Sequence, residues 1–314
     1  MQGIELSRKY YEEYGREMIA TNFPEYIDKI AVGLLGNGSE CFGYDDELSK
    51  DHDFEPGFIM WLNDEDYEAI NFKLFREYEK LPKEFMGIKR QATSFFGTGK
   101  YGVKTIGDFY REYTGKKGAP STNREWLHIP EYSLATVTNG VIFKDELGEF
   151  TRIRNEIVNG MPEDVRLKKI SARAALMAQS GQYNYKRSMG HKEVGAASLA
   201  LADFVKNTAS LIFLLNKKHA PFYKWIFRGL KDLEILSETT KDLEWIINCE
   251  NNYVNFADIS YSIEKVSAFI IEELKNQELS FGDWDYLEPH AYEVMKRIKD
   301  EEIRNMHVME GVSL

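Results

Sequence analysis

The chain has 314 residues, of which 43% are hydrophobic and 13% aromatic, a composition that excludes a disordered chain and allows two ordinary domains. Its formal net charge of -11 at pH 7 argues against DNA as a partner, because binding to the phosphate backbone needs a basic surface. A nucleotide remains compatible with this charge, since a metal ion can neutralise its phosphates locally. The cysteines and histidines show no zinc-binding spacing.

The N-terminal half predicts a sheet with helices. Residues 5–20 place tyrosines at helical spacing, and residues 64–81 begin with acidic side chains that suit the positive end of a helix dipole. Strands are expected where short apolar runs end in glycine or in a turn, over residues 29–36, 57–62, 101–106 and the first part of 139–150. The last of these segments continues through a turn at Gly148 into a helix.

The C-terminal half predicts helices alone. Pro162 occupies an expected N1 position, and long helical patterns follow over residues 162–179, 191–217, 228–248, 254–276 and 288–308. We therefore expect an α+β fold, with a mixed sheet and helices in a domain over residues 1–150 and an α-helical bundle over residues 151–314.

The sequence predicts no membrane partner. The apolar stretch 196–215 is interrupted by Asp203, Lys206 and Asn207, which is typical of a buried helix and not of a membrane span. The first residues are charged and contain no apolar core of a secretion signal. The expected location is therefore the cytoplasm.

The segment 33–55 contains glycines followed by acidic residues and resembles several ligand-binding motifs. A P-loop is excluded because no lysine follows the glycines, and the dinucleotide fingerprint fails at Cys41, where it requires glycine or alanine. An EF-hand loop beginning at Asp51 would need glycine and glutamate where Pro56 and Leu62 stand. The remaining non-functional interpretation is a solvated acidic loop that binds no ligand.

The pattern that passes these tests is Gly38-Ser39, eleven intervening residues, and then Asp51-His52-Asp53. On a strand, Asp51 and Asp53 would point to the same face, about 6.6 Å apart along the backbone, and could share a cation. Carboxylate oxygens favour Mg²⁺ in a phosphate site. The Gly-Ser turn would offer backbone N–H groups and a hydroxyl to a phosphate. The spacing thus favours a metal-assisted phosphate site over a solvated acidic loop without a ligand.

This order of strand, "GNGS", short helix, "SKDHDF" and strand resembles the nucleotidyltransferase superfamily that includes DNA polymerase beta and kanamycin nucleotidyltransferase. The segments "GEFTRIRNEI", "SGQYNYKR" and "LLNKKHAPFYKW" are similar to an uncharacterised bacterial family, in which such a domain precedes a helical domain like the C-terminal part of kanamycin nucleotidyltransferase. The resemblance implies that Gly38 and Ser39 contact phosphate and that Asp51 and Asp53 hold Mg²⁺ as catalytic residues.

The same resemblance implies a third carboxylate on a later strand, and here the sequence departs from the pattern. The expected strand carries Lys104 in place of an acid. Asp108 and Asp145 are the two alternatives, and each could instead be structural, Asp108 as a helix cap and Asp145 as a turn residue. Asp145 is taken as the third catalytic candidate. Lys224 and Arg187, which lie in the family-like segments, are candidates for contact with the triphosphate, or else ordinary surface side chains.

Three functions follow as expectations. The first is a Mg²⁺-dependent nucleotidyltransferase that moves a nucleoside monophosphate from a nucleoside triphosphate, ATP by preference, to a hydroxyl of a small-molecule acceptor. The second is a nucleotide-binding regulatory protein with a degenerate transferase site, which the missing third carboxylate would explain. The third is an interaction protein whose long helices form a homodimer surface.

Overall fold

The structure is a computed structural model that describes residues 1–51, 54–90 and 100–312, with the backbone alone at Lys50 and Asp51. The chain forms two compact units, which are described separately. Unit 1 comprises Met1–Pro120 and Ser133–Gly160, and unit 2 comprises Ser121–Tyr132 and Met161–Leu314. The α+β class is confirmed. The boundary expected near residue 150 falls inside helix α7 (Glu149–Asn159), which belongs to unit 1, and unit 2 includes an additional earlier segment.

Unit 1 contains a four-stranded sheet, and each strand expected from the sequence is present. The strands are β1 (Ala31–Leu34), β2 (Ile59–Leu62), β5 (Gly102–Thr105) and β6 (Val141–Lys144), in the order β5-β2-β1-β6. Strand β2 is parallel to β5, and β1 is antiparallel to both β2 and β6. Every residue of β1 and β2 is buried, which explains why both read as continuous apolar runs.

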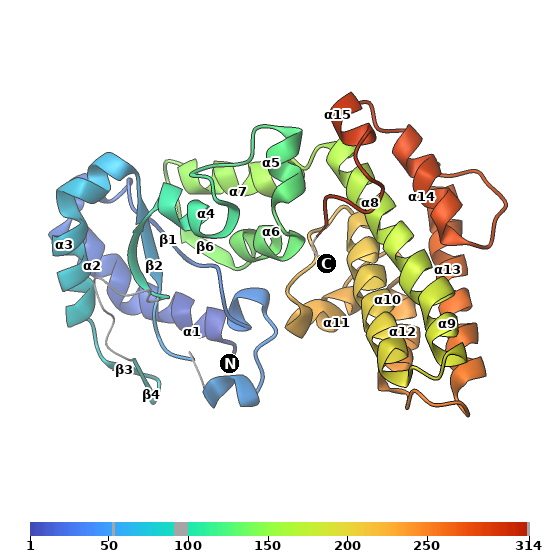
Figure 1. Ribbon diagram of the computed structural model, residues 1–314. Helices are drawn as coiled ribbons and strands as arrows, with labels where there is room; N and C mark the ends of the chain where they lie inside the picture. Colours follow the sequence, from blue (N-terminus) through green and yellow to red (C-terminus); the bar gives the residue numbers. More distant parts are fainter. Residues whose placement is uncertain (52–53, 91–99, 313–314) are drawn as a thin grey trace. The chain divides into compact units, whose positions relative to one another are not determined.

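Helices cover both faces of this sheet (Figure 1). One face packs against α1 (Gly3–Tyr10), α2 (Arg16–Asn22) and α3 (Asp64–Lys80), and Val32 and Met60 belong to the resulting core. On the other face, the Trp61 ring lies 5.3 Å from Phe109 of α4 (Ile106–Thr114) and 4.3 Å from Phe150 of α7. The helices predicted over residues 5–20 and 64–81 are confirmed.

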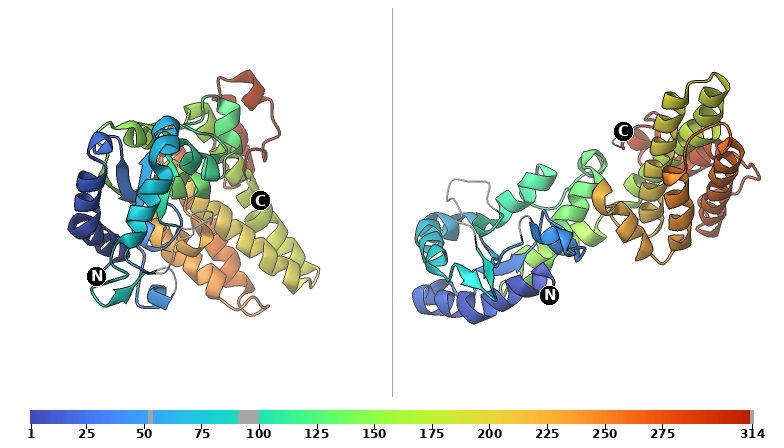
Figure 2. Two further views of the ribbon diagram at one scale, coloured as in Figure 1. Left: turned by 90° about the vertical axis from the view of Figure 1, so that its left-hand side faces the viewer. Right: turned by 90° about the horizontal axis from the view of Figure 1, so that it is seen from below.

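Helix α1 passes into α2 through a single π-helical segment, η1 (Tyr11–Gly15), and the three form one continuous rod (Figure 2). The amide of Arg16 donates to the carbonyl of Tyr11, five residues earlier. A side chain at Gly15 would come within 2.5 Å of the Phe58 ring. The wider turn therefore coincides with the point where glycine lets Phe58 approach the helix backbone.

The remaining elements of unit 1 are short. They are η2 (Pro24–Tyr26), η3 (Glu40–Phe42), η4 (Leu48–Asp51), the hairpin strands β3 (Glu84–Phe85) and β4 (Ile88–Lys89), and α6 (Glu131–Thr138), whose first two residues belong to unit 2.

Every helix or strand that the structure describes in unit 2 is a helix. Its elements are α5 (Asn123–His128), α8 (Glu163–Met177), the π-helical η5 (Ala178–Tyr185), α9 (Lys186–Gly190), α10 (Val194–Leu215), α11 (Tyr223–Lys231), η6 (Ser237–Thr239), α12 (Thr240–Asn248), α13 (Phe256–Asn276), α14 (Leu287–Lys296) and α15 (Glu301–Arg304).

Two of the expected long helices are each divided. Residues 228–248 contain the end of α11 and all of α12, and residues 288–308 contain most of α14 and the short α15. In the first gap, Leu236 adopts a positive φ of 61°, a conformation that a continuous helix does not allow. Pro162 is the N-cap of α8 and not its N1 residue.

Helix α10 is the one helix in the described residues that is long and apolar enough to cross a membrane by length and composition. Its most apolar window is 72% buried inside unit 2, where it packs alongside α8 (Figure 1). This degree of burial is typical of a core helix, which is what the interrupting polar residues predict.

Helix α8 buries four cationic side chains, and each has acceptors in unit 2. Arg166 donates to Glu163 and to the carbonyl of Leu214, and Arg173 donates to Asn207 and Glu131. The ammonium of Lys169 donates to the carbonyl of Ile129. Because a buried charge without a partner would cost several kcal/mol, these acceptors are a condition for α8 to lie at the centre of the unit.

Lys168 is the most completely enclosed of these cations, at 0% exposure. Its ammonium donates to the carbonyl oxygens of His307, Val308 and Glu310 at 2.9, 2.8 and 2.7 Å. Burial lowers the pKa of Lys168 to about 8, which still leaves the amine protonated at neutral pH. One side chain thus fixes the segment that follows α15 onto the central helix.

Replacing Lys168 with methionine should destabilise unit 2 by about 3 kcal/mol, because one buried and two part-buried carbonyls lose a charged donor. The exposed Lys241 on α12 gives a matched control, and Lys241→Met should change stability by less than about 0.5 kcal/mol. Urea denaturation of the full chain measures both. Equal effects of the two substitutions would show that the Lys168 contacts do not hold the segment.

Candidate functional site

Strand β1 ends in a turn over residues 36–39, the Gly-Ser turn, whose backbone needs glycine. Gly36 and Gly38 have φ angles of 104° and 121°, a region that other residues rarely adopt. The Asn139 side chain holds the first of them: its amide oxygen accepts from the Gly36 N–H and its amide nitrogen donates to the Gly36 carbonyl, both at 2.8 Å. Gly140 adds a backbone bond to the carbonyl of Cys41 at 2.7 Å. The turn is therefore fixed to the chain that enters β6.

This fixation leaves polar groups of the turn available to a ligand. Within the described part of the chain, the backbone N–H groups of Gly38 and Ser39 donate no hydrogen bond, and the Ser39 hydroxyl has no partner. Gly38 and Ser39 are only partly buried. Two adjacent backbone donors and a hydroxyl at a glycine turn can bind the oxygens of a phosphate. That Gly38 and Ser39 contact phosphate stays a prediction.

Two further side chains lie at the turn and were not identified from the sequence. The ammonium of Lys100 would be 2.6 Å from a β-carbon at Gly38, and it forms an ion pair with the carboxylate of Glu40. Glu40 is buried at 6% exposure. Burial lowers the pKa of Lys100 to about 7, an effect that the neighbouring carboxylate opposes. Gly38 is thus also required for space, because the ion pair lies where its side chain would be.

The acidic loop after the turn is organised by two carboxylates that the sequence analysis did not single out. Asp45 accepts from the N–H of Gly3 at 2.7 Å and so caps the first turn of α1. Asp46 accepts from the N–H groups of Leu48 and Ser49, both at 3.1 Å, and so initiates η4. These acids have structural roles.

The predicted metal pair lies largely beyond what the structure describes. Asp53 is outside the described residues, and Asp51 is described by its backbone alone, as the last residue of η4. The interpretation that Asp51 already lies on an extended strand is wrong, since its backbone is helical and β2 begins only at Ile59. Whether the two carboxylates share a cation therefore stays a prediction.

The alternatives for a third carboxylate both occupy structural positions. Asp145 accepts from the N–H of Thr151 at 2.7 Å and thereby supports the first turn of α7. Asp108 pairs with Arg111 at 3.2 Å in the first turn of α4, where the cap is Thr105 and not Asp108. Strand β5, beside β2, carries Lys104, whose ammonium lies 3.3 Å from Glu112. The strand where the acid was expected contains none.

The two basic candidates, Lys224 and Arg187, both belong to unit 2 and are exposed. Lys224 lies in the first turn of α11. Arg187, on α9, donates to the Tyr183 hydroxyl at 3.3 Å and lies over its ring. Their proposed contact with a triphosphate stays a prediction.

The chemistry of a metal at this loop can be judged from the donors present. Among the described residues, no three acidic, histidine or cysteine side chains gather closely enough to hold an ion. Asp45 nevertheless keeps one buried oxygen, Oδ1, without a hydrogen bond in the described part of the chain. Together with the carboxylates of Asp51 and Asp53, this loop supplies hard oxygen donors, the type that Mg²⁺ prefers. These donors are of the type that suits Mg²⁺, and that they hold the ion stays a prediction.

Comparisons with known proteins gave two findings. Residues 126–226 match a family described as a domain of unknown function (DUF4037), and this segment excludes the Gly-Ser turn. The chain is also similar to the crystal structure of a nucleotidyltransferase-like protein from Exiguobacterium sibiricum 255-15, with 12% identity, a TM-score of 0.38, and coverage of 91% of this chain and 81% of that one. No curated protein matches the chain.

Gly140→Ala should destabilise unit 1 more than Gly148→Ala. Both glycines have similar φ angles, 66° and 70°, so both substitutions carry about 1 kcal/mol of backbone strain. A β-carbon at Gly140 would also collide with the Leu34 carbonyl and lie 2.9 Å from Leu35 Cα, whereas at Gly148 nothing lies within 4 Å. We expect an additional loss of about 2 kcal/mol at Gly140, measured by thermal denaturation. Equal losses would mean that the turn does not need this close approach.

Proposed function

We propose that the chain is a Mg²⁺-dependent nucleotidyltransferase that transfers a nucleoside monophosphate from a nucleoside triphosphate to a hydroxyl of a small molecule. The observation that carries the proposal is the Gly-Ser turn, with the free N–H groups of Gly38 and Ser39 beside the Lys100 ammonium. Such a cluster of donors suits the oxygens of a triphosphate. ATP is the proposed donor, and the cytoplasm the proposed location.

In this proposal the residues of the chain position the reactants. Gly38 and Ser39 bind phosphate oxygens, and Asp51 and Asp53 hold Mg²⁺, which when bound neutralises charge on the phosphates. The acceptor hydroxyl attacks the α-phosphorus and gives its proton to water, the bond from the α-phosphorus to the oxygen bridging to the β-phosphorus breaks, and pyrophosphate leaves. Lys224 and Arg187 are proposed as further triphosphate contacts. Because phosphoryl transfer depends mainly on positioning and charge, the chain needs no covalent catalyst.

Lys100 is a further candidate phosphate contact, and it was not identified from the sequence. Its amine is beside Gly38 and therefore beside any phosphate held by the turn. Without nucleotide, the Lys100 ammonium forms an ion pair with the Glu40 carboxylate. A phosphate must compete with that carboxylate, so Glu40 weakens nucleotide binding in proportion to the strength of the pair.

The second candidate function is nucleotide binding without transfer, in a regulatory protein. Two observations favour it: β5 has no carboxylate, and Asp145 and Asp108 are engaged at helix starts. A base for the acceptor hydroxyl would then be missing. Nucleotide binding without release of pyrophosphate, for every acceptor tested, is the result that selects this alternative.

A thermal-shift screen of the four nucleoside triphosphates, with and without Mg²⁺, tests the proposed site. A ligand at about 100 times its Kd should stabilise the protein by about 2.7 kcal/mol. This Mg²⁺-dependent shift should disappear in Asp51→Ala and in Asp53→Ala. Glu47→Gln removes an exposed charge from the same loop and should keep the shift. A shift that survives both aspartate substitutions, or no shift with any nucleotide, would contradict the assignment.

Lys100 should make nucleotide affinity depend on pH. Its pKa of about 7 means that the amine loses its proton as pH rises above that value, so affinity should fall by about ten-fold from about pH 7 to about pH 8.5. Lys100→Arg stays charged and should show a smaller decline, which gives the baseline due to the nucleotide itself.

Glu40→Gln provides the complementary change, because it frees the amine and should raise affinity. Isothermal titration at each pH measures these effects. Identical pH profiles of wild type and Lys100→Arg, or weaker binding by Glu40→Gln, would remove Lys100 from the site.

A further inference from the structure

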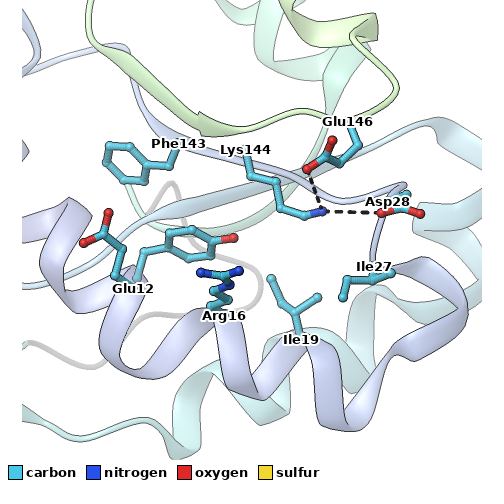
Figure 3. A pocket seen from close by; sticks show the side chains of 9 residues that line it. Glu12, Arg16, Ile19, Ile27, Asp28, Phe143, Lys144 and Glu146 are labelled. Atoms are coloured by element: carbon cyan, nitrogen blue, oxygen red, sulfur yellow. Dashed lines mark ion pairs between the residues drawn. The ribbon is translucent and has the colours of Figure 1, made fainter.

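Unit 1 has a cavity of about 340 Å³, bordered by the π-helical turn of the N-terminal rod and by the end of β6 (Figure 3). The antiparallel register places Lys144 beside Val32, near the start of β1, and Val141 beside Leu34, where β1 runs into the Gly-Ser turn. The cavity is therefore at the opposite end of these strands from the turn. Its volume is at the lower end of the range for ligand pockets, which fits a small molecule.

The cavity contains hydrogen-bond donors that the protein does not use. The Lys144 side chain is 85% buried, yet its ammonium has only ion pairs of 3.8 Å, to Asp28 and Glu146, and no hydrogen bond within the described residues. The Arg16 guanidinium and the Tyr11 hydroxyl interact electrostatically with each other, but neither makes a hydrogen bond or ion pair in the part of the chain that the structure describes. Burial raises the pKa of Tyr11, so its hydroxyl remains a donor.

The π-helical turn explains why two of these donors lie together. Tyr11 and Arg16 are five residues apart, a separation that would place them on different sides of an α-helix. In the π-helical turn the Arg16 N–H bonds to the Tyr11 carbonyl, which stacks the two residues on one side. The local insertion in the helix therefore assembles part of the cavity, as π-helical turns often do at functional sites.

The remaining lining residues supply acceptors and an apolar wall. Glu12, Asp28 and Glu146 bring three carboxylates to the two cations, and the side chains of Asp28 and Glu146 are 71% and 62% exposed. Figure 3 shows Asp28 and Glu146 on one side of Lys144 and Arg16 on the other. A simple anion would meet net negative charge here. A ligand with both a carboxylate and an ammonium would satisfy donors and acceptors together.

We propose that this cavity binds a free α-amino acid with an apolar side chain. The ligand carboxylate accepts from Arg16, Tyr11 and Lys144, and its ammonium donates to the carboxylates at the rim. Its side chain lies against Ile19, Ile27 and Phe143, which complete the wall. The site is separate from the proposed nucleotide site and does not depend on the proposed function.

Isothermal titration of the full chain with L-leucine tests this site, with two matched probes. Isocaproate lacks the ammonium and isoamylamine lacks the carboxylate, and each should bind at least about ten-fold more weakly than leucine. Arg16 is exposed, so Arg16→Gln should leave the fold intact and weaken leucine binding by about ten-fold or more. Arg76→Gln, an exposed arginine of α3 in the same unit, should bind leucine like the wild type.

Each contrary result overturns the proposal. No heat of binding with leucine up to about 10 mM would mean that the cavity is not an amino-acid site. Isocaproate binding as tightly as leucine would make it a site for plain carboxylates. Unchanged binding in Arg16→Gln, or an equal loss in Arg76→Gln, would place leucine elsewhere on the protein. Thermal denaturation of each variant verifies that it is folded.

Discussion

The arrangement of unit 1 around its candidate site depends on two hydrogen bonds between the Asn139 side chain and the backbone of Gly36. The Asn139 side-chain amide makes the donor and acceptor bonds that a backbone residue of a paired strand would make. It thereby continues the pairing of β1 with β6 beyond Leu34. Beyond Gly36, the Asn37 N–H bonds to the Tyr113 side chain, whereas the N–H groups of Gly38 and Ser39 donate no hydrogen bond within the described residues. Residues 103 positions apart thus cooperate in one turn, and that turn sets where Lys100, Glu40 and the acidic loop can lie.

Sequence patterns identified what local chemistry determines. Continuous apolar runs predicted β1 and β2 because both strands are buried on both faces, and the glycines predicted the turn because the backbone there needs positive φ. Contacts between residues far apart in the sequence could not be predicted. Nothing in the sequence near Gly38 indicates that Lys100 lies over it, and no periodicity indicates a π-helical turn at Gly15. The structural roles of Asp45 and Asp46 were likewise not predicted, because they depend on backbone partners that only the fold brings near.

Buried cations in the two units show how structural and ligand-binding charges differ. Helix α8 encloses four of them, and each has acceptors at hydrogen-bonding distance, so these charges specify how unit 2 packs. Lys144 is also mostly buried, but its nearest carboxylates lie at 3.8 Å and a cavity adjoins it. Burial alone therefore does not identify a functional charge. The state of its hydrogen bonds does.

The contacts of Lys168 impose an order on the synthesis of the protein. Its acceptors include Glu310, so the central helix of unit 2 obtains its last partner only when the residues up to 310 have left the ribosome. Unit 1 is complete once Gly160 has emerged, and it can fold while unit 2 is still being translated. During that interval the Lys168 ammonium lacks the three carbonyl oxygens that accept from it in the folded protein.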